Sequence, residues 1–282
     1  MSATLPGELS TQVKVRRAFS ETVDPAAYVP RASTESVLSE FETWAAENGT
    51  GSTIVALVAR PGFGKTFLLR VFESRLAADV TTEDRRRGIL YLPYAGLSTI
   101  DLCEWIHGLL GHSIRLPESP EDALRTLLDL ADGPKDPFVL LIDDADSMPP
   151  ETIRALVEGL PQSHSPLRIM LALNDDAKAS RLLATLDPLH PRLVRLQQPM
   201  SKTETAAYLD ARMKWAELEN AEIARVDAEA IGKIHTLSGG VPRRVHMIAA
   251  SLFDAGGMGL PSELDEKERR ENWMGRPIED DF

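Results

Sequence analysis

The chain has 282 residues and is 43% hydrophobic, which is enough for one large domain or two small domains with buried cores. Its formal net charge of −12 argues against broad electrostatic attraction to nucleic acid or to an anionic membrane. Cys103 is the only cysteine, so no internal disulfide can form, which suits a reducing compartment. No apolar run is long enough to span a bilayer, and the N-terminus lacks an apolar leader. We therefore expect a cytoplasmic protein without membrane insertion.

The N-terminal residues, 1–32, are predicted to form an extended arm, because they contain the helix breakers Pro25 and Pro30. An α/β domain is predicted to follow over residues 33–198. It begins with a helix for which Ser33 or Thr34 could serve as the N-cap.

Residues 54–66 predict a phosphate-binding loop between a strand and a helix. Residues 54–58 are apolar and β-branched, residues 60–64 form a glycine-rich turn, and Lys65 with Thr66 opens a helical pattern. Such a turn lets successive backbone N–H groups point into one concavity, and the helix adds its positive dipole end. We expect the Lys65 ammonium to reach the β- and γ-phosphates and the Thr66 hydroxyl to ligate Mg²⁺. The predicted nucleotide contacts of this loop are Pro61, Gly62, Phe63, Gly64, Lys65, Thr66 and Phe67.

One position departs from the full phosphate-loop signature. The signature begins with glycine, and Ala59 stands at that place. Alanine can replace this glycine if its backbone φ stays negative. The alternative is an ordinary turn with a chance Gly-x-Gly-Lys, which the flanking strand and helix patterns disfavour.

The rest of the α/β domain alternates between strand and helix patterns. Alternation of this kind is typical of a parallel sheet covered by helices on both faces, so we predict a five-stranded parallel sheet. The four further strands are predicted at residues 88–93, 138–142, 167–173 and 193–196. Helices between them are predicted to start near Ser98, Ser119, Pro149 and Asp176.

After Pro199 the pattern changes to helices only, which predicts a small helical lid over residues 199–257. Ser201 and Glu204 have the spacing of a capping box at the start of its first helix. Residues 258–282 are charged and mostly acidic, and we expect them to form a mobile tail.

Two carboxylates, Asp143 and Asp144, end the predicted strand 138–142. A carboxylate at the carboxyl end of a buried parallel strand faces the same crevice as the phosphate loop. There Asp143 could hold Mg²⁺ through its water shell, and Asp144 could orient the water that attacks the γ-phosphate. The alternative is a pair of aspartates that ends a strand and caps the following turn.

Four further side chains are candidates for contact with the γ-phosphate. Asn174 ends the next strand and could hydrogen-bond the attacking water, the alternative being an ordinary turn residue. Arg243 begins a lid helix and could reach back to the γ-phosphate, the alternative being a solvated arginine with Arg244 in its place. Arg192 or Arg195 could project into a neighbouring subunit as an arginine finger, or form a surface ion pair.

In this order, the pieces resemble the motifs of the AAA+ ATPases over roughly residues 28–255. Residues 60–66 look like Walker A and residues 139–144 look like Walker B, while Asn174 and Arg243 occupy the sensor 1 and sensor 2 places. The resemblance implies a P-loop NTPase with a helical lid, which binds ATP and Mg²⁺ and forms a homo-oligomer.

The segment Tyr28-Val29-Pro30-Arg31 resembles the one that touches adenine in this family, which makes Val29 an expected nucleotide contact. Within AAA+, the best resemblance is to the general secretion pathway protein A group, on residues 201–209 and 234–244. Walker B usually ends in Asp-Glu, and Asp144 is one methylene shorter. The departure puts efficient hydrolysis in doubt more than nucleotide binding.

Three functions compete on these observations. The first is a slow ATPase that acts as an oligomeric switch and remodels or assembles a protein partner. The second is a nucleic-acid-associated ATPase of the transposon target-selection type, which the acidic charge disfavours, although the basic run 85–87 leaves room for it. The third is a nucleotide-binding scaffold with negligible turnover, which Asp144 suggests.

Overall fold

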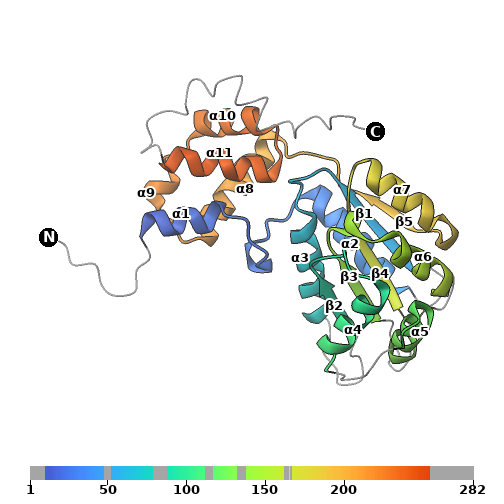
Figure 1. Ribbon diagram of the computed structural model, residues 1–282. Helices are drawn as coiled ribbons and strands as arrows, with labels where there is room; N and C mark the ends of the chain where they lie inside the picture. The colour runs from blue at the N-terminus through green and yellow to red at the C-terminus, as the bar shows by residue number, and fades with distance from the viewer. Residues whose placement is uncertain are drawn as a thin grey trace, which may run out of the picture.

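The computed structural model describes residues 10–47, 52–78, 88–111, 117–131, 138–161, 165 and 167–254. Figure 1 shows two bodies: a parallel sheet flanked by helices, and a smaller body built from helices alone. The predicted acidic tail, 258–282, and the basic run 85–87 lie outside the described residues. No described helix combines the length and the hydropathy needed to cross a membrane.

The sheet has five strands in the order β2-β3-β4-β1-β5, and every pairing is parallel, which confirms the predicted architecture. The strands are β1 Ile54–Ala59, β2 Ile89–Leu92, β3 Phe138–Ile142, β4 Leu167–Asn174 and β5 Arg192–Arg195. Because all five strands run in one direction, their carboxyl ends meet at one edge of the sheet. β4 lies between β1 and β3, so Asn174 at its end stands between the phosphate loop and Asp143.

Helices cover both faces of the sheet (Figure 1). They are α2 Ala32–Ala46, α3 Lys65–Ala78, α4 Thr99–Leu109, α5 Pro120–Ala131, α6 Pro150–Gly159 and α7 Ala177–Leu186, with short 3₁₀ turns at Pro25–Ala27, Ala145–Ser147 and Asp187–Leu189. Successive residues of β1 enter opposite cores: Ile54 packs with α4–α7, whereas Val55 packs with α2 and α3. A strand buried on both faces reads as a continuous apolar run, which is why the pattern at 54–58 was informative.

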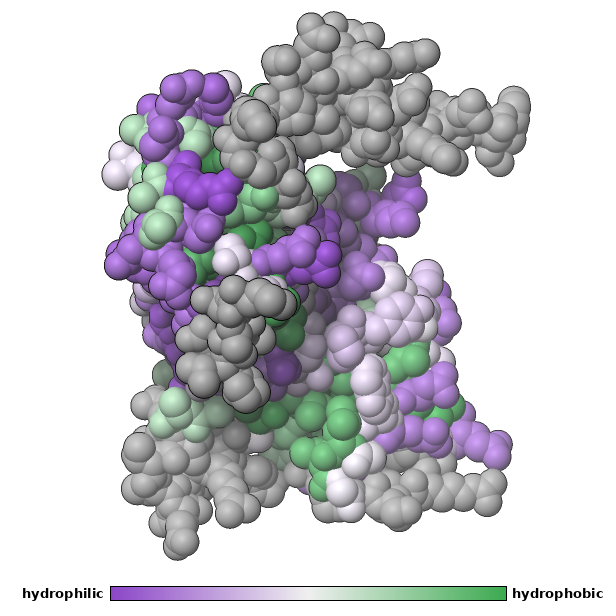
Figure 2. Space-filling view, turned by 90° about the vertical axis from the view of Figure 1, so that its left-hand side faces the viewer, coloured by the Kyte–Doolittle hydropathy of each residue, from purple (hydrophilic) through white to green (hydrophobic). Residues whose placement is uncertain are grey.

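The helical body contains α1 Thr11–Phe19, α8 Lys202–Trp215, α9 Asn220–Ile223, α10 Ala228–Ser238 and α11 Pro242–Asp254. The predicted capping box is confirmed: Glu204 N donates to Ser201 Oγ at 3.1 Å, and Ser201 N donates to Glu204 Oε2 at 2.8 Å. Figure 2 shows this body at the top, with polar residues over most of its visible surface and hydrophobic ones between them. Its apolar side chains form a core separate from the two cores of the sheet.

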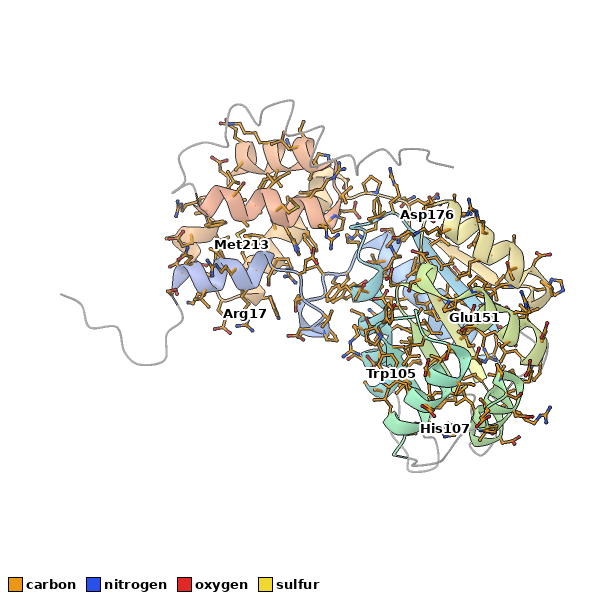
Figure 3. All side chains as sticks on the ribbon, viewed as in Figure 1. Arg17, Trp105, His107, Glu151, Asp176 and Met213 are labelled. Atoms are coloured by element: carbon orange, nitrogen blue, oxygen red, sulfur yellow. The ribbon has the colours of Figure 1, made fainter. Side chains whose placement is uncertain are left out.

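The prediction of an extended N-terminal arm is wrong for residues 11–19, which form α1. Ser10 caps this helix by accepting a bond from Val13 N, and Val15 and Phe19 are buried in the core of the helical body. Figure 3 shows Arg17 of α1 on the same body as Met213 of α8. The helix was missed because its apolar stripe is short and is completed only by packing on α8 and α11.

The predicted N-cap of α2 is also wrong. The helix begins at Ala32 after Arg31, and Thr34 is its third residue. The Thr34 hydroxyl accepts from Arg31 N at 3.2 Å, so it stabilises the helix start from inside the first turn. The sequence therefore predicted the correct first turn of α2, but it placed the N-cap two or three residues too late.

Candidate nucleotide-binding site

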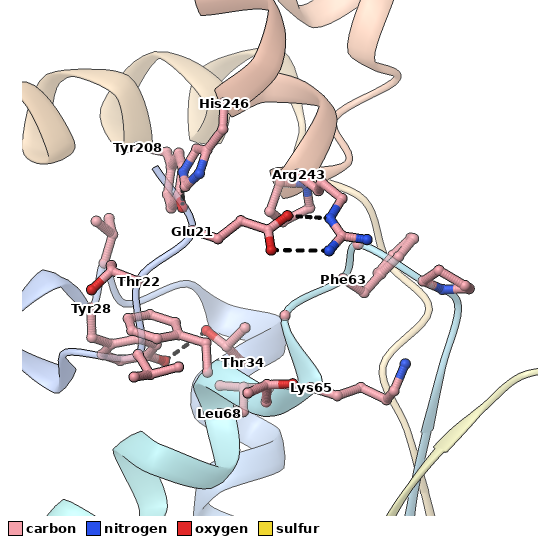
Figure 4. A pocket seen from close by; sticks show the side chains of 18 of the residues that line it. Glu21, Thr22, Tyr28, Thr34, Phe63, Lys65, Leu68, Tyr208, Arg243 and His246 are labelled. Atoms are coloured by element: carbon pink, nitrogen blue, oxygen red, sulfur yellow. Dashed lines mark hydrogen bonds and ion pairs between the residues drawn. The ribbon is translucent and has the colours of Figure 1, made fainter. Parts of the chain in front are cut away.

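A cavity of about 530 Å³ lies where the carboxyl edge of the sheet meets the helical body (Figure 4). Three parts of the chain line it: the phosphate loop with the ends of β3 and β4, the N-terminal segment (residues 20–31, between α1 and α2), and α8 with α11. Its lining includes every predicted nucleotide contact, namely Val29 and residues 61–67, together with Asp143, Asp144, Asn174 and Arg243. Arg192 and Arg195 do not line it.

The backbone of the loop requires its two glycines. Gly62 has φ +83° and Gly64 has φ +90°, both in the region that side-chain-bearing residues rarely adopt. Ala59 has no positive φ and pairs with Asn174 as the last residue of β1, so alanine is accommodated there as expected. The predicted strand, turn and helix are therefore confirmed, with α3 beginning at Lys65.

The helical body touches the loop directly. Arg243 N donates to Gly62 O at 3.2 Å, and a Cβ added to Gly62 would lie 3.1 Å from Arg243 Cβ. Gly62 therefore serves two purposes, since it permits the turn and lets the start of α11 approach. Sequence patterns predicted the first purpose only.

Lys65 is held at the sheet edge by two acceptors. Its Nζ donates to Ala59 O at 3.1 Å and to Asn174 Oδ1 at 2.8 Å, which leaves one N–H for a further acceptor. Burial lowers the pKa of the ammonium, and the nearby carboxylates, Asp146 first and then Asp143, oppose that shift. The arrangement holds one half-buried cation at the cavity, beside the N-terminus of α3.

Asp146 fixes the orientation of Asn174. Its carboxylate accepts from Asn174 N at 2.9 Å and from Asn174 Nδ2, so the amide oxygen is left facing Lys65. Burial raises the pKa of Asp146, and the bonds from Asn174 oppose that shift. The sequence signal for this role was weak, since Asp146 is only the third acid of the run that follows β3.

Asp143 has the surroundings of a metal-binding carboxylate. It is 7% exposed, Tyr91 OH donates to its Oδ2 at 3.0 Å, and Asp144 N donates to its Oδ1 at 3.0 Å. Thr66 lines the same cavity. A hydroxyl and one carboxylate fit Mg²⁺, which keeps several waters and takes phosphate oxygens as its other ligands.

Asp144 lies beside Asp143 in a left-handed conformation, with φ 49° and ψ 40°. Aspartate tolerates this conformation better than most residues. The turn leaves the Asp144 side chain exposed at the cavity wall, while Asp143 is buried. Adjacent acids are thereby separated into one buried carboxylate and one that faces the cavity.

The two arginines of β5 lie in ion pairs on the edge strand of the sheet. Arg192 Nη2 is 2.7 Å from Glu47 Oε1, and Arg195 Nη1 is 3.4 Å from Asp175 Oδ1. Arg192 pairs with Val55 near the start of β1, whereas Arg195 pairs with Val58 and so lies three residues nearer the phosphate loop. Their predicted role in a neighbouring subunit stays a prediction.

The end of the cavity remote from Lys65 is aromatic and basic. Tyr28 OH donates to Thr34 Oγ1 at 2.7 Å, and burial raises the pKa of Tyr28 to about 12. Arg31 is 8% exposed, and its Nη1 has no hydrogen-bond partner within the described part of the chain. Tyr208 and His246 stack with ring centroids 5.6 Å apart and share a 2.8 Å hydrogen bond.

Sequence reasoning missed Glu21, Tyr208 and His246 as cavity residues. Tyr208 and His246 lie within helical stripes, where an aromatic residue or a histidine is usually part of the core. Glu21 lies in the segment that was expected to be an extended arm. No local pattern could have joined these three residues, because they come from separate elements that meet only in the folded chain.

His246 predicts an acid-sensitive helical body. Burial lowers its pKa to about 4 from the usual 6.5, Arg212 adds to the effect, and Glu21 opposes it. Between these values the unfolded chain binds more protons, so the free energy of unfolding should fall as the pH falls. The loss should reach about 3 kcal/mol by pH 4 at 1.36 kcal/mol per pH unit.

Urea unfolding between pH 7 and pH 4 measures this effect. In His246→Gln, which keeps a polar partner for Tyr208, the loss over this window should shrink by that amount. His190→Asn is a matched control at an exposed histidine with φ 48°, a conformation that asparagine tolerates. An unchanged pH slope in His246→Gln would show that another group causes the acid sensitivity.

Comparison with known families gives one match. Residues 48–179 match the family model of an AAA domain, a span that includes the phosphate loop, the two aspartates and Asn174. A search of curated proteins found no match.

Several solved structures have a similar fold. Cdc6p from Pyrobaculum aerophilum has a TM-score of 0.63 at 19% identity, covering 86% of this chain and 66% of that one. Drosophila ORC bound to DNA has 0.62 at 18%, covering 92% and 64%. Aeropyrum pernix ORC2, in ADPNP–ADP complexes, has 0.58 at 18%, covering 91% and 72%. This chain therefore spans about two thirds of the length of these proteins, and likeness at such identity shows the fold alone.

Proposed function

We propose that the chain binds ATP with Mg²⁺ and hydrolyses the ATP slowly, because residues 48–179 match the model of an AAA domain and the fold is that of the AAA+ P-loop NTPases. One observation carries the proposal. A single cavity brings the phosphate loop, Lys65, Asp143, Asn174 and Arg243 together from two bodies of the molecule. A half-buried lysine and two strand-end carboxylates that converge at the N-terminus of a helix are the groups expected to bind a nucleotide phosphate with Mg²⁺.

In this proposal each group has one task. The loop N–H groups and Lys65 bind the β- and γ-phosphates, while Thr66 and Asp143 hold Mg²⁺. When bound, Mg²⁺ neutralises charge on the phosphate oxygens. Asp144 accepts a hydrogen bond from the attacking water and orients it in line with the γ-phosphate.

The proposal extends to assembly. Arg243 comes from the helical body and can sense the γ-phosphate, so ATP would bind the two bodies to each other. Arg192 and Arg195 lie outside the cavity of their own subunit, so a neighbouring subunit would complete the site. We therefore propose an oligomeric switch in which ATP binding and hydrolysis remodel or assemble a protein partner.

Asp144→Asn should retain ATP binding and lose turnover by about 10²-fold or more, in line with the loss of a general base. Asparagine keeps the size of the side chain and tolerates φ 49°, but it removes the charge that orients the water. Calorimetry measures binding, and phosphate release under saturating ATP measures turnover.

Asp144→Glu is the matched variant, because it restores the residue that usually follows the first aspartate in Walker B. Its turnover should equal or exceed that of the parent. If Asp144→Asn hydrolyses ATP at the parental rate, the role passes to another acid, and Asp146 is the first candidate. If the parent itself binds ATP without turnover, the protein is a nucleotide-binding scaffold.

A nucleic-acid-associated ATPase is the second candidate. The Drosophila ORC structure holds DNA, which favours this candidate, and the net charge of −12 opposes it. Binding of duplex DNA measured between low and moderate salt separates the two functions. A DNA-binding protein would bind the duplex at low salt and lose affinity steeply as the salt concentration rises, whereas an ATP-driven protein switch would not bind it at low salt either.

The partner can be identified by pull-down with ATP and with ADP. A protein retained in only one nucleotide state would be the client of the switch. The finer likeness to the general secretion pathway protein A group and the cytoplasmic location stay predictions.

A further inference from the structure

The guanidinium of Arg243 is held along one edge by a carboxylate from the N-terminal segment. Arg243 Nε and Nη2 both donate to Glu21, with Nη2 3.0 Å from Oε2. The two-bond contact lowers the pKa of Glu21 and raises that of Arg243, since each charge stabilises the other. Nη1 takes no part in this contact, so its edge can meet a second anion.

The direction of that free edge follows from Figure 4. Glu21 and Phe63 lie on opposite sides of the Arg243 guanidinium, and Phe63 belongs to the phosphate loop. The backbone of Arg243 is fixed at the same place by its bond to Gly62 O. The edge of the guanidinium that Glu21 leaves free is therefore the edge nearer the loop.

Glu21 is itself held in place by a buried arginine. Arg212 of α8 is 1% exposed and donates to the carbonyls of Ala18 at 2.8 Å, Ser20 at 3.4 Å and Ala27 at 3.3 Å. These carbonyls lie on both sides of Glu21 in the chain. The segment that carries Glu21 is thus fastened to the helical body, the same body that carries Arg243.

The Glu21–Arg243 pair contributes little to folding stability. The two side chains are 67% and 53% exposed, and water weakens the attraction between exposed charges. A planar two-bond contact does, however, restrict the orientation of a guanidinium. Orientation is therefore the property that this pair can supply.

We propose that Glu21 is a positioning residue for Arg243: it occupies the Nε edge and so turns the Nη1 edge toward the γ-phosphate of bound ATP. The inference rests on the proposed ATP site and adds to it a residue outside the recognised motifs. It predicts that Glu21 matters for ATP and not for ADP, because only ATP carries the phosphate that Arg243 meets.

The test compares the affinities of ATP and ADP in Glu21→Ala by calorimetry. ATP affinity should fall by about tenfold, the size expected for one misplaced charge-assisted hydrogen bond, while ADP affinity stays within about twofold of the parent. Glu21→Gln retains an acceptor and should show a smaller loss. Turnover at saturating ATP should also fall more in Glu21→Ala than in Glu21→Gln.

A double-mutant cycle separates positioning from a general effect on folding. Once Arg243→Ala has removed the guanidinium, Glu21→Ala should cause no further loss of ATP affinity. Glu219→Ala is the matched control. Glu219 forms an ion pair with Lys14 of α1 at 3.3 Å, and neither residue lines the cavity. The variant therefore removes another ion pair near the N-terminus without touching the proposed site.

The inference can be overturned in several ways. Tighter ATP binding in Glu21→Ala would mean that the carboxylate competes with the γ-phosphate. A loss that persists without Arg243, or one that is equal for ATP and ADP, would mean that Glu21 acts through the fold. If the parent binds neither nucleotide, the proposed ATP site fails as well, whereas a parent that binds ATP beside an unaffected Glu21→Ala rejects the positioning role alone.

Discussion

Lys65→Ala should abolish detectable nucleotide binding. The Lys65 ammonium is half-buried at the start of α3 and bonds to Ala59 O and Asn174 Oδ1, so it is held where phosphate oxygens would lie. Alanine removes both the charge and the donor from a site that also contains Asp143, Asp144 and Asp146. Without the ammonium, the repulsion between these carboxylates and the phosphates would no longer be offset at this place.

Titration calorimetry with ATP and Mg²⁺ measures this loss, and circular dichroism confirms that the variant is folded. Lys178→Ala, at an exposed lysine of α7 outside the cavity, controls for the loss of one positive charge and should bind as the parent does. If Lys65→Ala binds ATP as tightly as the parent, the nucleotide lies elsewhere. The assignments of Asp144 and Arg243 would then fall with that of Lys65.

Turnover per subunit should rise with protein concentration and with ATP-driven assembly. An arginine supplied in trans contributes about 10³- to 10⁵-fold in well-studied phosphoryl-transfer enzymes. The cavity contains Arg243 from its own chain, whereas Arg192 and Arg195 lie on the edge strand β5. We therefore expect the site to be incomplete in a monomer.

Arg192→Ala should bind ATP normally and hydrolyse it poorly, and Arg195→Ala tests the alternative position. Each arginine has an ion-pair partner that supplies a matched control. Glu47→Ala and Asp175→Ala break the same pairs but keep the arginines, so turnover should persist.

Mixing Arg192→Ala with Lys65→Ala gives the decisive result. A mixed interface joins an intact Lys65 from one subunit to an intact Arg192 from the other, so some activity should return. If the mixture stays inactive, the same mixing with Arg195→Ala tests the alternative finger. If both mixtures stay inactive and turnover per subunit is flat across concentration, the shared site is rejected in favour of a monomeric nucleotide switch.

Features that depend only on neighbouring residues could be predicted before the fold was known. The run 54–58 is apolar at every position because β1 is buried on both faces, and the glycines at 62 and 64 are needed for positive φ. The Ser201–Glu204 spacing closes a capping box within one turn. Each of these features is governed by local sterics and hydrogen bonding, which a short stretch of chain specifies.

Contacts between residues far apart in the chain became known only from the folded molecule. Strand order places β4 between β1 and β3, and so brings Asn174 to Lys65 and Asp146 to Asn174. Packing of α1 on α8 and α11 turns an expected arm into part of the helical body and brings Glu21 to Arg243. The physical reason is that these contacts join side chains far apart in sequence, so they arise from burial of apolar surface over the whole molecule rather than from local preference.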